Sequence, residues 1–455
     1  MITKENKLTK KHLLGYTLGD LGECMTFSIM GSFLTRYYIN VAMIDTSLLA
    51  VLTLIWKTVD AISNTFIGMF MDKMYAKKKY KEGKFRPWML RATPLLAVTA
   101  ILVFTAPNYL EGLSKLVVVF MSYLSYTLFY NMFNIPYGSL LTVMSKNEGE
   151  RAQLSSARGI GGMLGSMLPS IMFPIILSAF SKAPELGYGL GVVICAVLGF
   201  VFCLMSYYFT EERCGDVTKK EIQESNFLDI FEVARKNRAF IALAIHGVFQ
   251  GITQAINMSM GTYLFSDVFG NLSLMSISSV CVMPFTGAAL ILSPYLVKKM
   301  GTMKLIRGGL VIGTGIYVIL FLLHVFTDIN PMVHILLSSA GAMFTGVGTM
   351  MQWGLVGETI DYNEYLLGKR SEGTIYGTFN MLRRLGQAIG TSGSVALLGI
   401  IGYDVAISNA GMLQSEQTIL GIKILCILVP AIVTIGSWIS FKFIWNITPE
   451  LNNNG

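Results

Sequence analysis

Residues 54–88 read LIWKTVDAISNTFIGMFMDKMYAKKKYKEGKFRPW, and this stretch decides the fold. Its first half is an apolar segment that carries Lys57 and Asp60, which lie three residues apart and therefore on one face of a helix. Its second half is a short loop that is dense in Lys and Arg and ends in FRPW. Opposite charges in an apolar helix beside a basic hairpin are typical of a membrane protein that carries a charged molecule, or that carries a molecule together with an ion.

The composition excludes an ordinary soluble domain. Of 455 residues, 53% are hydrophobic and 14% are charged, whereas soluble proteins are about a quarter charged. Apolar segments recur along the chain in windows of roughly 19 residues, so the bilayer is the expected solvent. The formal net charge of +8 is carried mainly by short loops. This pattern indicates the orienting bias of a membrane protein, and we expect no nucleic-acid partner.

About twelve segments approach the ~20 residues that a bilayer-spanning helix needs. Lys and Arg gather in the N-terminal tail, the hairpin at 72–91, the polar stretch after residue 210 and the turn at 298–307. The positive-inside rule then predicts a multi-pass protein of the cell membrane with both termini in the cytoplasm. The expected spans are approximately 15–41, 47–72, 88–106, 115–144, 153–181, 187–210, 239–268, 273–297, 305–326, 331–360, 373–402 and 418–446.

Six expected spans on each side of a polar stretch suggest two related halves. We expect an N-terminal six-helix bundle at 1–210, a cytoplasmic linker at 211–238, and a C-terminal six-helix bundle at 239–455 with a short cytoplasmic tail. The basic turns GMFMDKMYAKKK and PYLVKKMGTMK occupy matching places in the two halves, although cytoplasmic turns are basic in any case. Paired halves around a central site are the plan of many secondary transporters.

Ionisable residues inside expected spans are candidates for function because they are costly in lipid. They could also neutralise one another and only hold helices together. Unlike charges on several helices favour a lined cavity over that reading. Besides Lys57 and Asp60, the charges that we weigh are Asp20 and Glu23 in the first span, Arg158 in the fifth, and Arg383 and Arg384 in the eleventh.

Amide and aromatic side chains in the same spans suit a hydroxyl-rich ligand. In the seventh span they recur at steps of four, four and three, which defines one helical face. A single polar residue of this kind is usually helix–helix contact, but a stripe is harder to explain in that way. The residues are Tyr130, Asn131 and Asn134 in the fourth span, His246, Gln250, Gln254 and Asn257 in the seventh, and Gln352 and Trp353 in the tenth.

Motifs of enzymes are missing from the sequence. It contains no GxSxG, HExxH or Walker A motif, and its six cysteines show neither CxxC spacing nor a cluster with His. We therefore expect no enzyme activity, no cofactor and no disulfide. Transport would be driven by an ion gradient or be passive.

Seven motifs in a fixed order resemble a known family. They are GYTLGDLGE, WKTVDAISNTFIGMFMDK, GKFRPW, NIPYGSL, ERAQLSSAR, GETIDYNEYLLGKRSEG and YGTFNMLRRLGQAIG. In this combination the chain resembles the glycoside–pentoside–hexuronide:cation symporters, the family of melibiose permease within the major facilitator superfamily. The resemblance implies an all-α membrane fold of twelve helices in two six-helix halves around a central cavity. It also implies uptake of a sugar or glycoside with a proton or sodium.

The resemblance also implies roles for single residues. Asp60 falls on the carboxylate of the coupling-cation site, and Asn64 stands where that site has a second carboxylate. With its carboxylates thinned to Asp60, assisted by Glu23, the site favours a proton, since sodium needs several oxygen ligands; sodium, if it is used, would bind at Asp60. Basic residues would then face few carboxylates, which favours an acidic sugar such as a hexuronide over a neutral galactoside.

The candidate set has three parts, and the third follows from interpreting the basic hairpin as a cytoplasmic gate. The cation-coupling candidates are Asp60, Glu23, Asn64 and Asn131; the substrate candidates are Lys57, Tyr130, Asn134, Arg158, Gln250, Gln254, Trp353 and Arg384; the gating candidates are Asp72, Lys73 and Asp361.

Two other functions remain open from the sequence. Distant relatives of the family carry lysolipids, but the polar stripe on the seventh span argues against an amphiphile symporter. A membrane sugar sensor that does not transport usually carries an appended signalling domain, whereas this sequence continues only to TPELNNNG after the twelfth span. We expect a functional monomer whose partners are the sugar, the cation and the bilayer.

Overall fold

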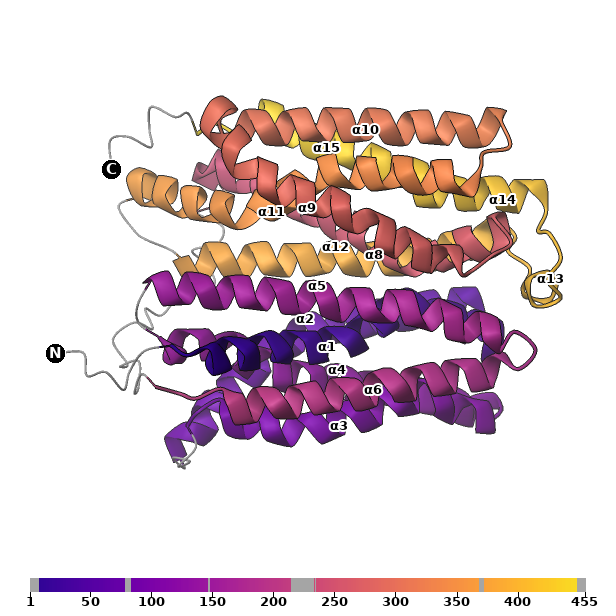
Figure 1. Cartoon of the computed structure of the whole chain (residues 1–455), viewed down its shortest axis with the longest axis horizontal. Coiled ribbons are helices and arrows are strands. Elements are labelled where there is room, and N and C mark those ends of the chain that lie inside the picture. Colours follow the sequence, from indigo (N-terminus) through magenta and orange to yellow (C-terminus); the bar gives the residue numbers. More distant parts are fainter. Residues whose placement is uncertain are drawn as a thin grey trace. The chain divides into compact units, whose positions relative to one another are not determined.

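The computed structural model describes residues 8–77, 83–145, 148–213, 233, 235–367 and 372–447. Within these ranges every regular element is a helix (Figure 1). The first six long helices are α1 (Lys10–Arg36), α2 (Thr46–Lys77), α3 (Arg86–Thr105), α4 (Gly112–Met144), α5 (Glu148–Ala179) and α6 (Pro184–Phe209). The others are α8 (Arg238–Tyr263), α9 (Leu274–Met300), α10 (Thr302–Phe326), α11 (Pro331–Leu367), α12 (Glu372–Ile400), the short α13 (Val405–Asn409), α14 (Glu416–Lys423) and α15 (Val429–Phe443).

A π-helical turn at Ile424–Leu428 joins α14 to α15, so the described residues form the twelve predicted segments of bilayer-spanning length. Nine of them, among the described residues, are also apolar enough to cross a membrane. The other three are α1, α2 and α12, each of which carries two of the ionisable residues predicted inside spans. The prediction of an all-α, multi-pass membrane protein is confirmed.

Two compact units make up the chain. Unit 1 contains Met1–Asp45 and Thr58–Glu221, and unit 2 contains Thr46–Lys57 and Ile222–Gly455. The bundle bounds 1–210 and 239–455 stay a prediction. The linker predicted at 211–238 lies mostly outside the described residues.

The two units pack their helices in the same order. In unit 1, α1 packs against α5 and α6, and α3 packs against α4 and α6. In unit 2, α8 packs against α12 and α15, and α10 packs against α11 and α15. Figure 1 lets the reader follow both sets. The first helix of each unit therefore contacts the fifth and the sixth.

Glycines set the register between α1 and α5. A Cβ atom at Gly161 would lie 2.2 Å from the backbone oxygen of Thr17, and one at Gly165 would lie 2.4 Å from that of Leu21. Real carbon atoms do not approach so closely, so only glycine allows this contact. Close approach at small residues is how helices commonly associate in membranes.

The same device recurs between α8 and α12. A Cβ atom at Gly386 would lie 2.1 Å from the backbone oxygen of Val248, and one at Gly390 would lie 2.7 Å from that of Ile252. The two glycines again lie four residues apart, and so do their partners. Both first helices then end in a π-helical turn, Tyr37–Val41 after α1 and Leu264–Val268 after α8.

Apolar cores fill each unit separately. In unit 1 a cluster around Tyr16, Phe133 and Tyr137 joins α1 to α4. The rings of Tyr16 and Tyr137 stack with centroids 4.6 Å apart. In unit 2 a cluster that includes Phe379 and Phe441 joins α8, α10, α11, α12 and α15. These cores hold the helices that carry the polar side chains described below.

A carboxylate from beyond α6 caps the start of α3. Glu212 accepts hydrogen bonds from the backbone N–H groups of Lys84, Phe85 and Arg86 at 2.8, 2.6 and 3.0 Å. Gly83 precedes them with φ of +107°, and a Cβ atom there would lie 2.3 Å from the Glu212 carboxyl carbon. Negative charge at a helix N-terminus is stabilising. The first residues of the predicted linker are therefore fixed to unit 1.

Candidate functional site

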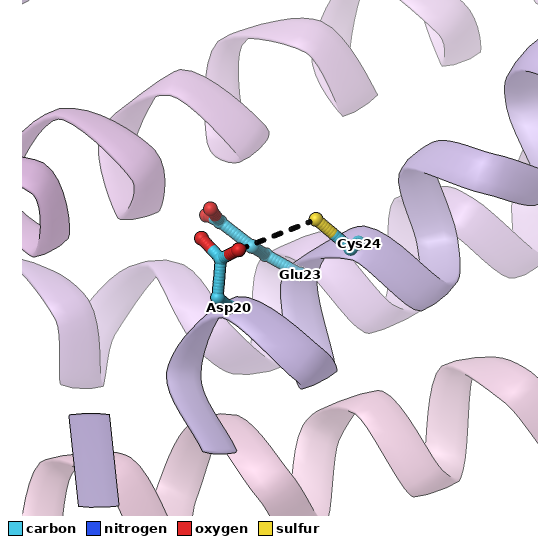
Figure 2. Close-up of side chains that lie close together, drawn as sticks. All are labelled: Asp20, Glu23 and Cys24. Carbon is cyan, nitrogen blue, oxygen red and sulfur yellow. Dashed lines mark hydrogen bonds between the residues drawn. The ribbon is translucent and has the colours of Figure 1, made fainter. Parts of the chain in front are cut away.

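A buried acidic cluster lies on α1 and consists of Asp20, Glu23 and Cys24 (Figure 2). The ligand atoms of the three side chains lie within 4.8 Å of one another. Only 7% of Asp20 and 1% of Glu23 is exposed. Two carboxylates one turn apart can be buried together only if other groups supply positive charge, protons or hydrogen bonds.

Arg158 of α5 supplies the positive charge. Its Nε atom lies 3.1 Å from Oδ1 of Asp20, and its guanidinium lies over the ring of Tyr137 at 5.3 Å from the centroid. Gly162 makes room for the pair, because a Cβ atom there would lie 2.4 Å from Oδ2 of Asp20. On the other side, the Cys24 thiol approaches Oδ2 at 3.9 Å (Figure 2).

Glu23 is held by α4 instead. Its Oε1 atom accepts a hydrogen bond of 2.6 Å from Nδ2 of Asn134. Its Oε2 atom is buried and has no hydrogen-bond partner among the described residues. A buried carboxylate oxygen without a hydrogen-bond partner can accept a hydrogen bond from a ligand or carry a proton.

Asp60, the main carboxylate of the predicted cation site, is also held by α4. Asn131, which is fully buried, donates through Nδ2 to Oδ1 of Asp60 at 2.7 Å and to the Ser63 hydroxyl at 3.1 Å. The amide oxygen of Asn131 is buried without a hydrogen-bond partner in the described part of the chain. Rotating this amide by half a turn would place its oxygen beside the oxygens of Asp60 and Ser63.

One face of α4 therefore connects both acids. Asn131 and Asn134 lie one turn apart and reach Asp60 on α2 and Glu23 on α1, respectively. Tyr130 precedes them and stacks on Phe27 of α1 with ring centroids 5.5 Å apart. The structure thus brings together four of the predicted site residues on α1, α2 and α4, with Tyr130 beside them.

The acidic cluster is a poor metal site although its spacing would allow an ion. Arg158 already binds Asp20, so a second cation would compete with a guanidinium. The Cys24 thiol is a soft ligand, whereas sodium and magnesium prefer hard oxygen ligands. The sequence shows Asp20 and Glu23 three residues apart, but the contact between Cys24 and the Asp20 carboxylate appears only in the structure.

One premise of the sequence interpretation is wrong. Arg158 was expected to face few carboxylates, but it pairs with Asp20 beside Glu23. Asp20 is one of the charges predicted inside spans, but it is not among the predicted site residues. The pairing depends on the register between α1 and α5, which the sequence shows only through Gly161, Gly162 and Gly165.

The repeated register places Arg383 where unit 1 has Arg158. Gly161 corresponds to Gly386 and Thr17 to Val248, so three residues before each glycine stands an arginine. The position of Asp20 is then taken by Gly251. Arg383, which the candidate set omits in favour of its half-buried neighbour Arg384, is therefore the structural counterpart of Arg158.

The polar stripe on α8 is divided by the fold. His246 is 3% exposed and packs on the Phe441 ring at 4.8 Å within the core of unit 2. Gln250 is half-buried and Gln254 is exposed. The Gln254 side chain accepts a 2.9 Å hydrogen bond from Gln387 of α12. The interpretation of one continuous polar face is wrong for His246.

The remaining candidates are less well defined by the structure. Lys57 is half-buried one turn before Asp60 on α2, and Asp361 is exposed near the end of α11. The side chains of four further candidates lie outside the described residues: Asn64, Asp72, Lys73 and Trp353.

Comparison with known proteins gives a match over nearly the whole chain. The sequence profile of the family described as "MFS/sugar transport protein" matches residues 15–448. The glucuronide carrier protein homolog of Escherichia coli (strain K12) is 29% identical over 427 residues, which cover 93% of this chain and 90% of that protein. The putative sulfoquinovose importer of the same organism is 24% identical over 444 residues, which cover 98% and 91%.

A solved structure shares the fold. The D-xylose–proton symporter superposes with a TM-score of 0.66 at 13% sequence identity, covering 95% of this chain and 97% of that one. The matching proteins are transporters, which confirms the prediction that the chain is a transporter and not an enzyme.

Proposed function

Because the chain belongs to the MFS/sugar transport family, we propose that this secondary transporter imports an acidic sugar or glycoside by symport with a proton. Two relatives support the acidic substrate, since their names specify a glucuronide and a sulfoquinovose. One of these sugars carries a carboxylate and the other a sulfonate. What they share is a hydroxyl-rich ring with one fixed negative charge.

The chain offers matching chemistry for both parts of such a ligand. We assign the anionic group to the basic residues Lys57 and Arg384, since guanidinium and ammonium groups bind carboxylates and sulfonates by charge-assisted hydrogen bonds. Arg158 is already paired with Asp20 and is assigned to sugar hydroxyls. The same assignment is made for Tyr130, Asn134, Gln250, Gln254 and Trp353.

The single observation that carries the coupling proposal is the link through α4. Asn131 binds the carboxylate of Asp60, and Asn134 binds that of Glu23 one turn away. A proton on Asp60 changes what its oxygen can accept from Asn131. A movement of α4 that follows would alter the hydrogen bond between Asn134 and Glu23, beside the Asp20–Arg158 pair. Coupling then needs one titrating carboxyl and no resident metal or cofactor.

Sodium is the second candidate for the coupling ion. The amide of Asn131, when rotated, would add a third oxygen to those of Asp60 and Ser63, and sodium prefers several hard oxygen ligands. In the structure the amide nitrogen of Asn131 faces both oxygens. A proton needs only the one carboxyl of Asp60, whereas sodium needs several oxygen ligands. We therefore favour the proton.

The proposed setting follows from the loop charges. The transporter would act as a monomer in the cell membrane with both termini in the cytoplasm. Asp72 and Lys73 in the last turns of α2, and Asp361 near the end of α11, are proposed to act in cytoplasmic gating.

Reconstituted vesicles test the proposal. Uptake of a labelled glucuronide is measured under an imposed proton gradient, an imposed sodium gradient or neither, with a neutral galactoside and a sulfonated sugar as competitors. We expect the proton gradient to drive accumulation and the sulfonated sugar to compete better than the galactoside. Stronger competition by the galactoside would reject the acidic substrate. Accumulation with sodium alone would reject the proton, and ligand binding without uptake would indicate a sensor.

A further inference from the structure

An apolar groove opens on unit 2 between α9, α10 and α11. It has a volume of about 220 Å³ and is bordered by Leu292 and Met300 of α9, Lys304 and Ile312 of α10, and Phe344 of α11. Along α10 it extends from Lys304 to Ile312, which is about 12 Å at the rise of an α-helix. The groove therefore runs along the helices, in the direction that a lipid chain takes in a bilayer.

Two adjacent glycines of α10 shape the groove. A Cβ atom at Gly309 would lie 2.6 Å from the backbone oxygen of Phe344, so this glycine brings α10 close to α11. Gly308 has open space around the corresponding position, with no atom within 4 Å. Leu292, Met300 and Ile312 on the rim are 45%, 48% and 48% exposed. The groove is thus accessible from the side of the protein.

One end of the groove is strongly basic. Lys304 lines it, and Lys298 and Lys299 lie in the last turn of α9; all three side chains are exposed. The sequence contains no Asp or Glu from residue 268 to residue 327. These lysines therefore have no acidic neighbour on either of the two helices that carry them.

We propose that this groove binds an anionic phospholipid. One acyl chain lies along α10 between α9 and α11, and the phosphate contacts Lys304 with Lys298 and Lys299 beside it. Pockets that enclose whole small ligands have about 300–1,000 Å³, so the smaller groove suits part of one chain whose remainder stays in the bilayer. Clusters of basic residues at the membrane surface attract anionic headgroups.

Two pairs of variants separate the chain from the headgroup. Gly308→Leu fills the groove, and Gly315→Leu is its control, since Gly315 lies two turns further along α10, is exposed and also has no atom within 4 Å of its Cβ position. Lys304→Gln removes one charge at the groove, and Lys442→Gln removes one exposed charge on α15, outside the groove.

Native mass spectrometry of the full-length chain in mild detergent provides the readout. Phosphatidylglycerol and phosphatidylcholine with identical acyl chains are added in equal amounts. We expect the unmodified chain to retain one phosphatidylglycerol in preference. We expect Lys304→Gln to lower that preference roughly fivefold, since one surface lysine contributes about that factor. Gly308→Leu should lose both lipids, while both controls behave like the unmodified chain.

Several outcomes would overturn the proposal. Equal retention of the two lipids by the unmodified chain would show that the lysines select no headgroup. Equal competition by soluble glycerol phosphate would indicate a simple anion site. A change from dimer to monomer in Gly308→Leu, with lipid retention unchanged, would show an interface between copies. If Gly308→Leu does not fold, the exposed substitution Lys304→Gln still decides, because its failure to lower the preference contradicts the proposal.

Discussion

The Nε atom of Arg158 lies 3.1 Å from Oδ1 of Asp20, so an ion pair joins α5 to α1 beside the carboxylate of Glu23. The pair lies at a close helix contact, because a Cβ atom at position 162 would lie 2.4 Å from Oδ2 of Asp20 and would displace the carboxylate. Packing and charge at this site therefore cannot be changed independently.

Removing the carboxylate should destabilise unit 1. Asp20→Asn breaks the ion pair with Arg158, but 37% of the Arg158 side chain is exposed and solvent screens part of the loss. We expect a loss of about 1–2 kcal/mol in the free energy of unfolding, between the values for surface and buried pairs. Thermal unfolding in detergent measures it, with Asp328→Asn, which removes an exposed charge in the loop between α10 and α11, as control. Equal melting temperatures would show that the pair contributes no stability.

Asp60→Asn should uncouple transport without unfolding the protein. The new amide oxygen can still accept the hydrogen bond from Asn131, while the carboxyl that could carry the coupling proton is gone. We expect gradient-driven accumulation in vesicles to be abolished and exchange of substrate across the membrane to persist. Accumulation at the original level would remove Asp60 from the coupling role.

Asn131→Asp should shift the preference of the coupling site from a proton toward sodium. The substitution places a second buried carboxylate beside Asp60, where two like charges repel unless a cation or a proton separates them. We expect a lower melting temperature in potassium salt that sodium restores, since an ion at 100 times its Kd stabilises by about 2.7 kcal/mol. Asn131→Leu, which removes the amide without adding a carboxylate, is the control. Identical melting in sodium and potassium would contradict this prediction.

Gly161→Ala should separate α1 from α5, whereas Gly159→Ala should be tolerated. The added carbon at Gly161 would meet a backbone oxygen at 2.2 Å, which cannot move without the helix, but the same carbon at Gly159 has no atom within 4 Å. We expect a cost of about 1–3 kcal/mol for the first variant only. Thermal unfolding of the matched pair checks this, and equal stability would contradict the α1–α5 register.

Glu212→Gln should loosen the start of α3. The carboxylate caps three N–H groups, and losing its charge at a helix N-terminus should cost about 0.5–1 kcal/mol. Glu211→Gln is the control, since Glu211 is 62% exposed and its contact is His12 at 3.9 Å. Limited proteolysis of the α2–α3 hairpin should accelerate only in Glu212→Gln. Equal cleavage of both variants would show that the cap does not fix the hairpin.

Helix positions and several site residues could be predicted from sequence because both follow local rules. The apolar segments define the spans, and the contact between Asp60 and Asn131 joins two of the predicted cation-coupling residues. The partner of Arg158 could not be predicted, because it depends on how two helices slide past each other. His246 was misassigned since its spacing defines a face of α8 without saying whether that face meets the core. The Glu212 cap joins residues 126–128 positions apart, beyond any local pattern.

The matching glycine contacts of the two units have a consequence for how such a protein can diversify. Gly161 and Gly386 hold their helices in the same register. The equivalent position on the partner helix is nevertheless an acid, Asp20, on α1 and a glycine, Gly251, on α8. The residues that fix the helix packing and the residues that carry charge therefore occupy different positions on the same helices. The specificity of one half can therefore change through a few side chains, while the glycine contacts that hold its helices together are kept.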